Sequence, residues 1–350
     1  MGIQANIHHL PTYKKYQKVT VLLEEHLQSG GFLKVDLPVL LPALIPESYL
    51  EIFETEYRFL DKRQKLYLTP SPELLLKRLL VDGIGDCYYL GKAFRNSEPA
   101  SSKHLGEFTM LEMYKVGATY LDMADIVLKM LQTVQSKMQK GERKNTNSMM
   151  IEYQGVNVDL SKWERMTVAE AFLRYAGVEQ EILFDHEKFI AHAKKKGYQT
   201  EKTEPSGEFA KEHFSYEELW SQMYTNEIEQ HLGMNGFPTL LFDYPVEFAS
   251  LSKPNTHGRT AQRFEFYIAG VELGNCYGEL NDWKLQQSRL QFELQEREKS
   301  GKISHVPDWG FVDALKKGLP DSAGIAIGIE RLGMIFTNTK SIEELKLVTL

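Results

Sequence analysis

A run of alternating small and bulky residues near the end of the chain is followed closely by an arginine. Isoleucine occupies every second position from 325 to 329, and the small residues that alternate with it are Gly324, Ala326 and Gly328. Successive side chains of a strand point to opposite faces, so the isoleucines would enter a core while the other face exposes nearly bare backbone. Arg331 lies three residues beyond Gly328. A planar guanidinium beside a flat surface suits a nucleotide whose phosphate contacts the arginine. The simpler alternative is a strand whose bare face packs against a helix.

A second arginine, Arg95, directly follows a strand-like run over 87–94 and stands at the mouth of a polar loop. A further strand-like run covers 106–117. The residues on one of its faces are Phe108, Met110, Glu112 and Tyr114. An aromatic ring, a carboxylate and a phenol in one row favour a binding surface, although a solvated hairpin explains the same pattern.

Carboxylates recur in the segment 263–282, on strands that otherwise look buried. The polar residues of this segment that matter here are Glu265, Glu272, Asn275, Tyr277 and Glu279. Buried carboxylates destabilise a fold unless they bind a cation or a metal ion. Together with Glu112 and the two arginines, they predict a site with two kinds of ligand, Mg²⁺ on phosphates and a cationic amine. Strict alternation cannot place Glu272 and Asn275 on one face, so a bulge near Gly274 is predicted.

The elements that would position these residues follow from periodicity and from cap and turn residues. Helices are predicted over 15–30, 72–83, 119–140 and 282–300. Strands are predicted over 32–42, 87–94, 106–117, 239–248 and 263–275, the last with a hairpin turn at Ala269 and Gly270. Ser71 would cap the helix that begins at Pro72. Long strands without regular helical crossovers indicate an α+β fold, an antiparallel sheet flanked by helices.

The stretch 166–236 differs from its surroundings because it is charged and helical in pattern. It contains a capping box at Ser215 and Glu218 and a helix stop at Gly233. We interpret about 180–236 as a helical insertion within a single domain that covers 1–350.

The composition is that of an ordinary globular protein, with 42% hydrophobic and 25% charged residues. A formal charge of -7 argues against a general nucleic-acid binder, since such proteins carry a basic excess. Cys87 and Cys276 form no CxxC pair, so neither a disulfide framework nor a zinc site is indicated. No stretch resembles a membrane span or a secretory signal, and a cytoplasmic protein without membrane contact is expected.

Three stretches, in order along the chain, resemble motifs 1, 2 and 3 of class II aminoacyl-tRNA synthetases. They are 31–42 with Gly31 and Pro38, 94–112 with Arg95, and 324–331 with Arg331. Stretches that resemble the lysyl branch of this class are 71–80, 107–114 and 272–282. The resemblance covers most of the chain outside about 180–236. It implies a class II catalytic domain that uses ATP and Mg²⁺ and forms a homodimer through motif 1, whose apolar run 37–45 would otherwise be exposed.

The resemblance also implies a role for each matching residue. ATP would be bound by Arg95, Glu98, His104, Phe108, Gly324, Gly328 and Arg331, the two arginines being catalytic. Mg²⁺ would be held by Glu265 and Glu272. A lysine-like amino acid would be bound by Ser71, Glu73, Glu112, Tyr114, Asn275, Glu279 and Ala326. The amino-acid carboxylate would attack the α-phosphate of ATP and give an aminoacyl-adenylate and pyrophosphate, mainly through positioning and charge neutralisation.

Lysyl-tRNA synthetases carry an anticodon-binding OB domain ahead of motif 1, and the thirty residues before Gly31 are too few for such a barrel. No anticodon recognition of tRNA is therefore expected. The chain is similar to the short lysyl-tRNA synthetase paralogues that modify a lysine of translation elongation factor P, which implies this factor as the protein acceptor. Ser71 and Ala326 stand where the synthetases have alanine and glycine, and this favours β-lysine over α-lysine. A plain helix cap explains Ser71 equally well.

Two other functions stay open. One is an amino-acid-activating paralogue that charges tRNA or another carrier. The other is a catalytically silent synthetase-like regulatory protein, which the presence of both arginines and of Glu265 and Glu272 disfavours. Motif 2 also departs from its usual pattern, because Ser97 precedes Glu98 and leaves the nucleotide contact at this point open.

Overall fold

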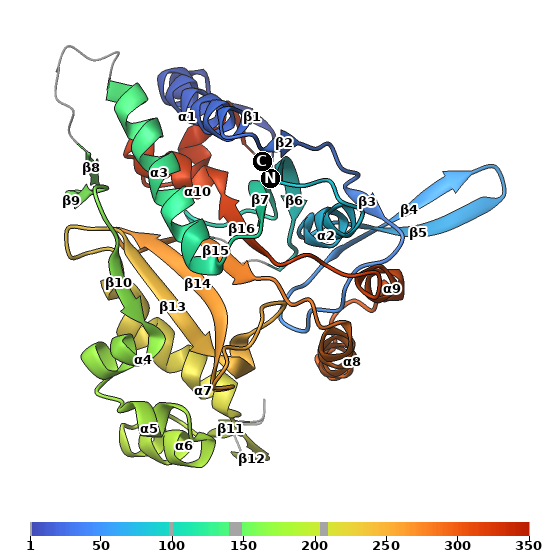
Figure 1. Cartoon of the computed structure of the whole chain (residues 1–350), viewed down its shortest axis with the longest axis vertical. Coiled ribbons are helices and arrows are strands. Elements are labelled where there is room, and N and C mark those ends of the chain that lie inside the picture. Colours follow the sequence, from blue (N-terminus) through green and yellow to red (C-terminus); the bar gives the residue numbers. More distant parts are fainter. Residues whose placement is uncertain (1, 98–100, 140–148, 204–208, 350) are drawn as a thin grey trace.

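An eight-stranded sheet runs through the centre of the protein (Figure 1). This computed structural model describes residues 2–97, 101–139, 149–203 and 209–349. In spatial order the strands are β10 (Glu164–Thr167), β13 (Thr239–Pro245), β14 (Thr260–Ile268), β15 (Val271–Gly278), β16 (Ser322–Gly328), β7 (Glu107–Val116), β6 (Cys87–Phe94) and β2 (Leu33–Lys34). Neighbouring strands are antiparallel except at the two edges, where β10 with β13 and β2 with β6 are parallel. The prediction of an antiparallel-rich α+β fold is therefore confirmed.

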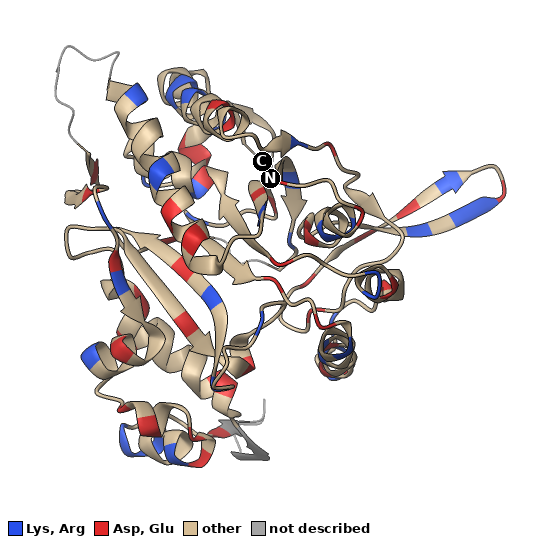
Figure 2. Ribbon diagram, in the orientation of Figure 1, with Lys and Arg blue, Asp and Glu red and all other residues tan. Residues whose placement is uncertain are grey.

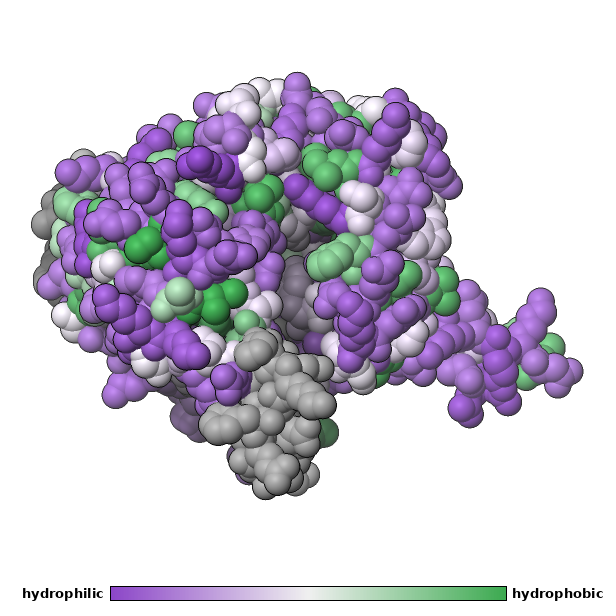
Figure 3. Space-filling model, turned by 90° about the horizontal axis from the view of Figure 1, so that it is seen from below, coloured by the Kyte–Doolittle hydropathy of each residue, from purple (hydrophilic) through white to green (hydrophobic). Residues whose placement is uncertain are grey.

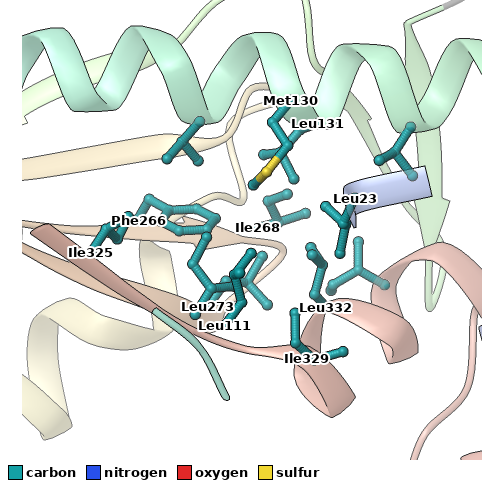
Figure 4. Packing of buried hydrophobic residues seen from close by; sticks show 14 of the residues in the cluster. Leu23, Leu111, Met130, Leu131, Phe266, Ile268, Leu273, Ile325, Ile329 and Leu332 are labelled. Atoms are coloured by element: carbon teal, nitrogen blue, oxygen red, sulfur yellow. The ribbon is translucent and has the colours of Figure 1, made fainter. Parts of the chain in front are cut away.

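One face of the sheet is covered by helices and holds the main core. The helices are α1 (Leu10–Ser29), α3 (Tyr120–Gln139) and α10 (Ile329–Thr337). Leu23, Met130, Phe266 and Ile325 meet between these helices and the strands (Figure 4). The isoleucines of β16 face this core as predicted, since Ile325 is 1% and Ile327 0% exposed. The small residues of β16 consequently point to the opposite face.

The opposite face of the sheet is covered at its two ends. At the β6 end lie α2 (Glu73–Val81), α8 (Trp283–Lys299) and α9 (Trp309–Leu315), and apolar residues of these helices pack together with residues of β6 and β7. At the β13 end, the helical segment 168–231 packs on β13 and β14. The middle strands lie between these two parts, and Figure 3 shows a hollow on this side of the molecule. The fold thus leaves room above the small residues of β16.

The segment 168–231 forms the helices predicted for it. They are α4 (Val168–Ala171), α5 (Gln180–Leu183), α6 (His186–Lys195) and α7 (Tyr216–Met223), with π-helical turns at Phe172–Ala176 and Tyr224–Ile228. The segment has a hydrophobic cluster separate from the main core, in which Trp220 packs with Leu241 of β13 and Tyr267 of β14. The predicted capping box is present, because Ser215 Oγ accepts a hydrogen bond from the Glu218 N–H at 3.2 Å. Two short strands, β11 (Glu201–Thr203) and β12 (Phe209–His213), pair within the segment.

A two-stranded arm projects from the body of the protein, and only a short strand beginning at Leu66, ahead of the cap at Ser71, was predicted in it (Figure 1). It consists of β4 (Phe53–Phe59) and β5 (Lys62–Leu68), with β3 (Leu40–Leu41) paired to the base of β5. Most of its residues are exposed and many are charged (Figure 2). In β4, Phe53, Thr55, Tyr57 and Phe59 alternate with charged residues, which is the pattern of a strand. β5 begins with the polar run 62–65 and shows no such alternation. The remaining strands pair in twos: β1 (Gln4–Ala5) with β17 (Val348–Thr349), and β8 (Met150–Tyr153) with β9 (Val156–Asp159).

The β14–β15 hairpin contains the predicted turn and the predicted bulge. Its turn at 269–270 has positive φ at both residues, which suits a two-residue hairpin loop. Across the ladder, Gly274 and Glu272 pair with consecutive residues of β14, so Leu273 is an extra residue. This bulge restores Glu272 to the face that carries Asn275.

The predicted helices end close to where they were expected, and α1 begins earlier. It starts at Leu10 because Pro11 fits its first turn, where no intrahelical N–H is needed. Within the described part of the chain, none of the helices combines the length and the apolar character that crossing a membrane requires.

Candidate active site

Strand β16 brings the separate polar clusters of the sequence onto one face. Across its two ladders, Ala326 pairs with Glu112 of β7 and with Asn275 of β15. Gly324 likewise pairs with Tyr114 and Tyr277. Residues directly opposite each other on neighbouring strands share a face of the sheet. The small residues of β16 therefore lie between carboxylate, amide and phenol groups.

Glu112 lies next to the start of helix α2, where Ser71 and Glu73 line a small cavity. Its side chain is 3% exposed and accepts hydrogen bonds from Tyr114 Oη and Ser71 Oγ, each at 2.8 Å. Burial, and then the charge of Glu73, raises the pKa of Glu112 to about 8. Ser71 Oγ also accepts a hydrogen bond from the Glu73 N–H at 3.1 Å. The cap and pocket interpretations of Ser71 therefore both describe real contacts.

Lys77 lies between two of the predicted amino-acid-binding carboxylates, although it was not among the predicted site residues. Its side chain is 1% exposed, and Nζ lies 2.5 Å from Glu73 Oε1 and 2.6 Å from Glu279 Oε2. Burial opposes its charge, but Glu279 and Glu73 hold the pKa of Lys77 above its usual range. Burial raises the pKa of Glu279 to about 7, and Lys77 counteracts this rise. The signal in the sequence was the i, i+4 spacing of Glu73 and Lys77.

Gly324 is required by side-chain packing in the pocket wall. A Cβ at this position would lie 2.3 Å from Tyr114 Cε1 and 2.4 Å from Glu279 Oε1. These side chains cover the backbone here, which differs from the expectation that Gly324 contacts a nucleotide. Ala326 and Gly328 are half-buried, and the atom nearest to a Cβ on Gly328 would be 3.9 Å away. The bare part of the strand is consequently its end, from 326 to 328.

Arg331 stands at this bare end, in the first turn of α10. Its guanidinium donates to the backbone carbonyls of Glu272 at 3.2 Å and Lys103 at 3.1 Å, and His104 Nε2 lies 2.7 Å from Nη2. The Glu272 carboxylate is 3.4 Å from Nη1, and its side chain is 35% exposed. Burial and the charge of Glu265 raise the pKa of Glu272, while Arg331 lowers it. The structure thus brings Arg331, His104 and Glu272 together.

Arg95 lies against Phe108 at the loop that follows β6. The guanidinium carbon is 5.5 Å from the centre of the Phe108 ring, a cation–π distance. The Nε atom of Arg95 is buried and has no hydrogen-bond partner among the described residues. An unsatisfied buried donor on a cation favours an anionic ligand at this point. Glu98, which was predicted to bind ATP, lies outside the described residues.

Glu265 is enclosed by protein donors. Its Oε2 accepts hydrogen bonds from Tyr244 at 2.6 Å and Tyr267 at 2.5 Å, and its Oε1 accepts one from Arg263 at 2.6 Å. Glu272 is therefore the more available of the two predicted Mg²⁺ ligands. Among described residues, no three His, Cys, Asp or Glu side chains are arranged to hold a metal ion by themselves. Arg263 was not predicted as a site residue, although alternation places it on the same face as Glu265.

Asn275 is held in one orientation by its neighbours. Its Oδ1 accepts a hydrogen bond from Arg263 Nε at 3.2 Å, and its Nδ2 donates to Tyr277 Oη at 3.1 Å. The amide is half-buried and lies opposite Ala326. Asn275 thus links the Arg263 network to the floor of the site.

A further carboxylate, Glu47, lines the same small cavity as Ser71 and Glu73. Burial and the charge of Glu73 raise the pKa of Glu47 to about 7. The buried Arg297 holds this loop by donating to the Glu47 carbonyl at 2.7 Å and the Leu50 carbonyl at 2.5 Å. Glu47 lies in an irregular segment between predicted elements, so no periodicity marked it.

Comparison with known proteins shows what the chain is similar to. The family model described as tRNA synthetases class II (D, K and N) matches residues 10–348. A lysine-tRNA ligase of Carboxydothermus hydrogenoformans is 33% identical over 341 residues, which is 97% of this chain and 65% of that protein. Lysine-tRNA ligases of Listeria innocua and Staphylococcus saprophyticus are 34% and 32% identical, over 94% and 96% of this chain. The chain spans 62% to 65% of the length of these relatives.

Proposed function

The chain belongs to the class II tRNA synthetases of the D, K and N type, and from this premise we propose that it activates a lysine-like amino acid with ATP. The observation that carries the proposal is the pocket at Glu112. There the carboxylates of Glu73, Glu112 and Glu279 lie close together at the side of β16, around Ser71 and Lys77. Buried carboxylates in excess of protein cations favour a cationic ligand. A diamino acid such as lysine supplies it.

The end of β16 suits an ATP molecule with its Mg²⁺. Class II synthetases use both. Arg331 and Arg95 would bind phosphate oxygens, and the unpartnered Nε of Arg95 supports this role. Glu272 would hold Mg²⁺, because an ion on a nucleotide needs one or two protein carboxylates beside phosphates and water. Bound Mg²⁺ would supply neutralisation of the phosphate charge.

The remaining nucleotide contacts would come from residues near the two arginines. Phe108 would stack on adenine, His104 would lie over the nucleotide beside Arg331, and Gly328 would leave space for it. Glu265 would affect the bound Mg²⁺ only through its charge, since its carboxylate already accepts hydrogen bonds from protein donors.

The amino acid would lie along the strand with its carboxylate toward the arginines. Glu73 would bind the amino group near the carboxylate, and Glu112 and Glu279 would bind the distant ammonium. Held in this way, the carboxylate would attack the α-phosphate of ATP while Arg331 neutralises charge on the departing pyrophosphate. Positioning and preorganised charge account for the rate of such a transfer.

We propose a lysine side chain of elongation factor P as the acceptor and β-lysine as the preferred substrate. Ser71 and Ala326 support this proposal, because one contacts Glu112 and the other lies opposite it on β16. Both stand beside the amino-acid pocket, where a methyl group or a hydroxyl changes the shape. The second candidate acceptor is tRNA, which the names of the longer relatives favour.

A homodimer is a further part of the proposal. Within the apolar run 37–45, Leu41, Leu44 and Ile45 are buried, whereas Leu40 is 48% exposed. Exposed apolar side chains on α1 and within motif 1 support the proposal, since Val21 is 51% and Leu33 54% exposed.

Two assays in sequence test the proposed function. Amino-acid-dependent pyrophosphate exchange is measured for α-lysine, β-lysine, ornithine and methionine, and exchange with a lysine but not with methionine is expected. Transfer from the adenylate to purified elongation factor P and to lysine tRNA is then compared. Absence of exchange with every amino acid would contradict activation, and transfer to tRNA alone would replace the proposed acceptor.

A further inference from the structure

The proposed amino-acid pocket contains a cation of its own. Lys77 comes from helix α2 and carries its ammonium between Glu73 and Glu279, at 2.5 and 2.6 Å. Its side chain is 1% exposed, so this ammonium is a permanent part of the pocket. When all three are ionised, the carboxylates of Glu73, Glu112 and Glu279 against this one ammonium leave two negative charges.

The groups that face this lysine come from several elements. Glu73 lies one turn earlier on the same helix, and Glu279 follows the end of β15. Glu112 of β7 acts on Lys77 by its charge, and Tyr114 donates its hydroxyl to Glu112. Lys253 is a second, more distant cation that acts on Glu279 and is itself paired with Asp321. Among the described residues, Lys77 is thus the cation in contact with Glu73 and Glu279.

Glu279 has one oxygen that the described protein does not satisfy. Lys77 forms an ion pair with Oε2 at 2.6 Å. Oε1 is buried, has no hydrogen-bond partner among the described residues, and lies over the backbone of Gly324. A buried carboxylate oxygen without a donor destabilises the free protein. It therefore points to a ligand that brings a donor.

We propose that Lys77 is a positioning residue that adapts the pocket to amino acids with two ammonium groups. It cancels one of three carboxylate charges and holds Glu73 and Glu279 on either side of itself. The two charges left match the two ammonium groups of a diamino acid. An amino acid with one ammonium group leaves a buried carboxylate unpaired, which is unfavourable. This inference rests on the proposed activation of a lysine-like amino acid.

Removal of this ammonium changes the protonation of the pocket. Without Lys77, Glu73 and Glu279 lose the opposite charge next to them and face each other and Glu112 as like charges. Both effects favour the neutral carboxyl forms. The two ammonium groups of bound lysine restore the charged forms, so protons must leave on binding. The variant Lys77→Met, which keeps an unbranched side chain, should therefore release more protons per lysine bound.

Calorimetric titration of the whole protein with α-lysine and with β-lysine measures this number. Titrations in two buffers of different ionisation enthalpy give the number of protons released per lysine bound. A pH series gives the midpoint of the pH dependence of the binding constant. For Lys77→Met we expect affinity lower by roughly tenfold or more and a midpoint higher by about one pH unit or more. The control is Arg78→Met in the same helix, whose partner Asp308 at 2.7 Å lies outside the carboxylate pocket. The control should titrate like the parent protein.

A second variant keeps the test decisive. Lys77→Met/Glu279→Gln removes one charge of each sign and leaves two negative charges, so it should bind lysine better than Lys77→Met does. The proposal would be overturned if folded Lys77→Met released as many protons as the parent protein and had the same pH midpoint. If Lys77→Met does not fold or bind, a folded double variant that binds lysine supports the proposal, and any other result overturns it. A parent protein that binds neither lysine would instead refute the proposed function.

Discussion

The choice between β-lysine and α-lysine depends on two residues whose places in the pocket are now defined. Ser71 Oγ donates to the buried Glu112 carboxylate at 2.8 Å and accepts from the Glu73 N–H at 3.1 Å. One lone pair of this hydroxyl is left to accept a hydrogen bond from a substrate ammonium. Ala326 lies directly opposite Glu112 on β16 and is half-buried. We therefore expect the double variant Ser71→Ala/Ala326→Gly to shift preference toward α-lysine.

The magnitude follows from the groups removed. A hydrogen bond to a charged group contributes about 1.5 to 3 kcal/mol. A single methyl group in a substrate pocket decides about 1 to 3 kcal/mol between related substrates. Part of each of these two contributions is the same for α-lysine and β-lysine, because the side-chain ammonium of both substrates reaches the same carboxylates. A difference of about 1.4 kcal/mol between the two substrates corresponds to a tenfold change in their ratio, and we expect at least this.

The assay is pyrophosphate exchange, with the ratio of kcat/KM for β-lysine and α-lysine as the measured quantity. Two control variants make the same chemical changes elsewhere. Ala323→Gly acts on the same strand but on the buried side, at 0% exposure, and Ser341→Ala removes the cap of the short helix Ile342–Leu345. Both should leave the ratio unchanged. An unchanged ratio in the double variant would show that Ser71 and Ala326 act as a helix cap and a strand filler.

Four other predictions concern the nucleotide end, the pH dependence, the pocket wall and the assembly. Arg331→Ala and Glu272→Ala should each reduce exchange by at least about a hundredfold while the melting temperature changes little, and near-parent exchange in either would exclude that residue from the site. Burial raises the pKa of Glu112 from about 4.5 in the unfolded chain to about 8 in the folded protein. The contribution of this group to the free energy of unfolding is therefore fully present below about pH 4.5 and is lost as the pH rises through about 8. Melting temperature should therefore fall more steeply with pH in the parent than in Glu112→Gln, and an equal slope would contradict this. Gly324→Ala should weaken lysine binding by tenfold or more, because its Cβ would lie 2.4 Å from Glu279 Oε1, and unaltered calorimetric affinity would refute the packing argument. Light scattering at micromolar concentration should give the mass of a dimer, and a monomer would remove that part of the proposal.

The sequence by itself determined the features that depend on neighbours along the chain. The alternation in β16 identified its core face, because side chains of a strand point to opposite sides in turn. The same rule required a bulge between Glu272 and Asn275, and the ladder contains it. The turn at 269–270 followed from a glycine that tolerates positive φ. Each of these conclusions needs a few consecutive residues and no knowledge of the rest of the fold.

The tertiary structure decided which polar groups meet and which of them are left for a ligand. Lys77 and Glu279 are far apart along the chain, and their contact depends on how α2 packs beside the end of β15. Glu265 looked as available as Glu272 until the fold enclosed its carboxylate between Arg263 and two tyrosines. The charge and free hydrogen-bonding capacity of a buried group depend on its neighbours in space, because desolvation and Coulomb energy act over a few ångströms regardless of chain distance. A carboxylate is visible in a sequence, but its partner is set by the fold.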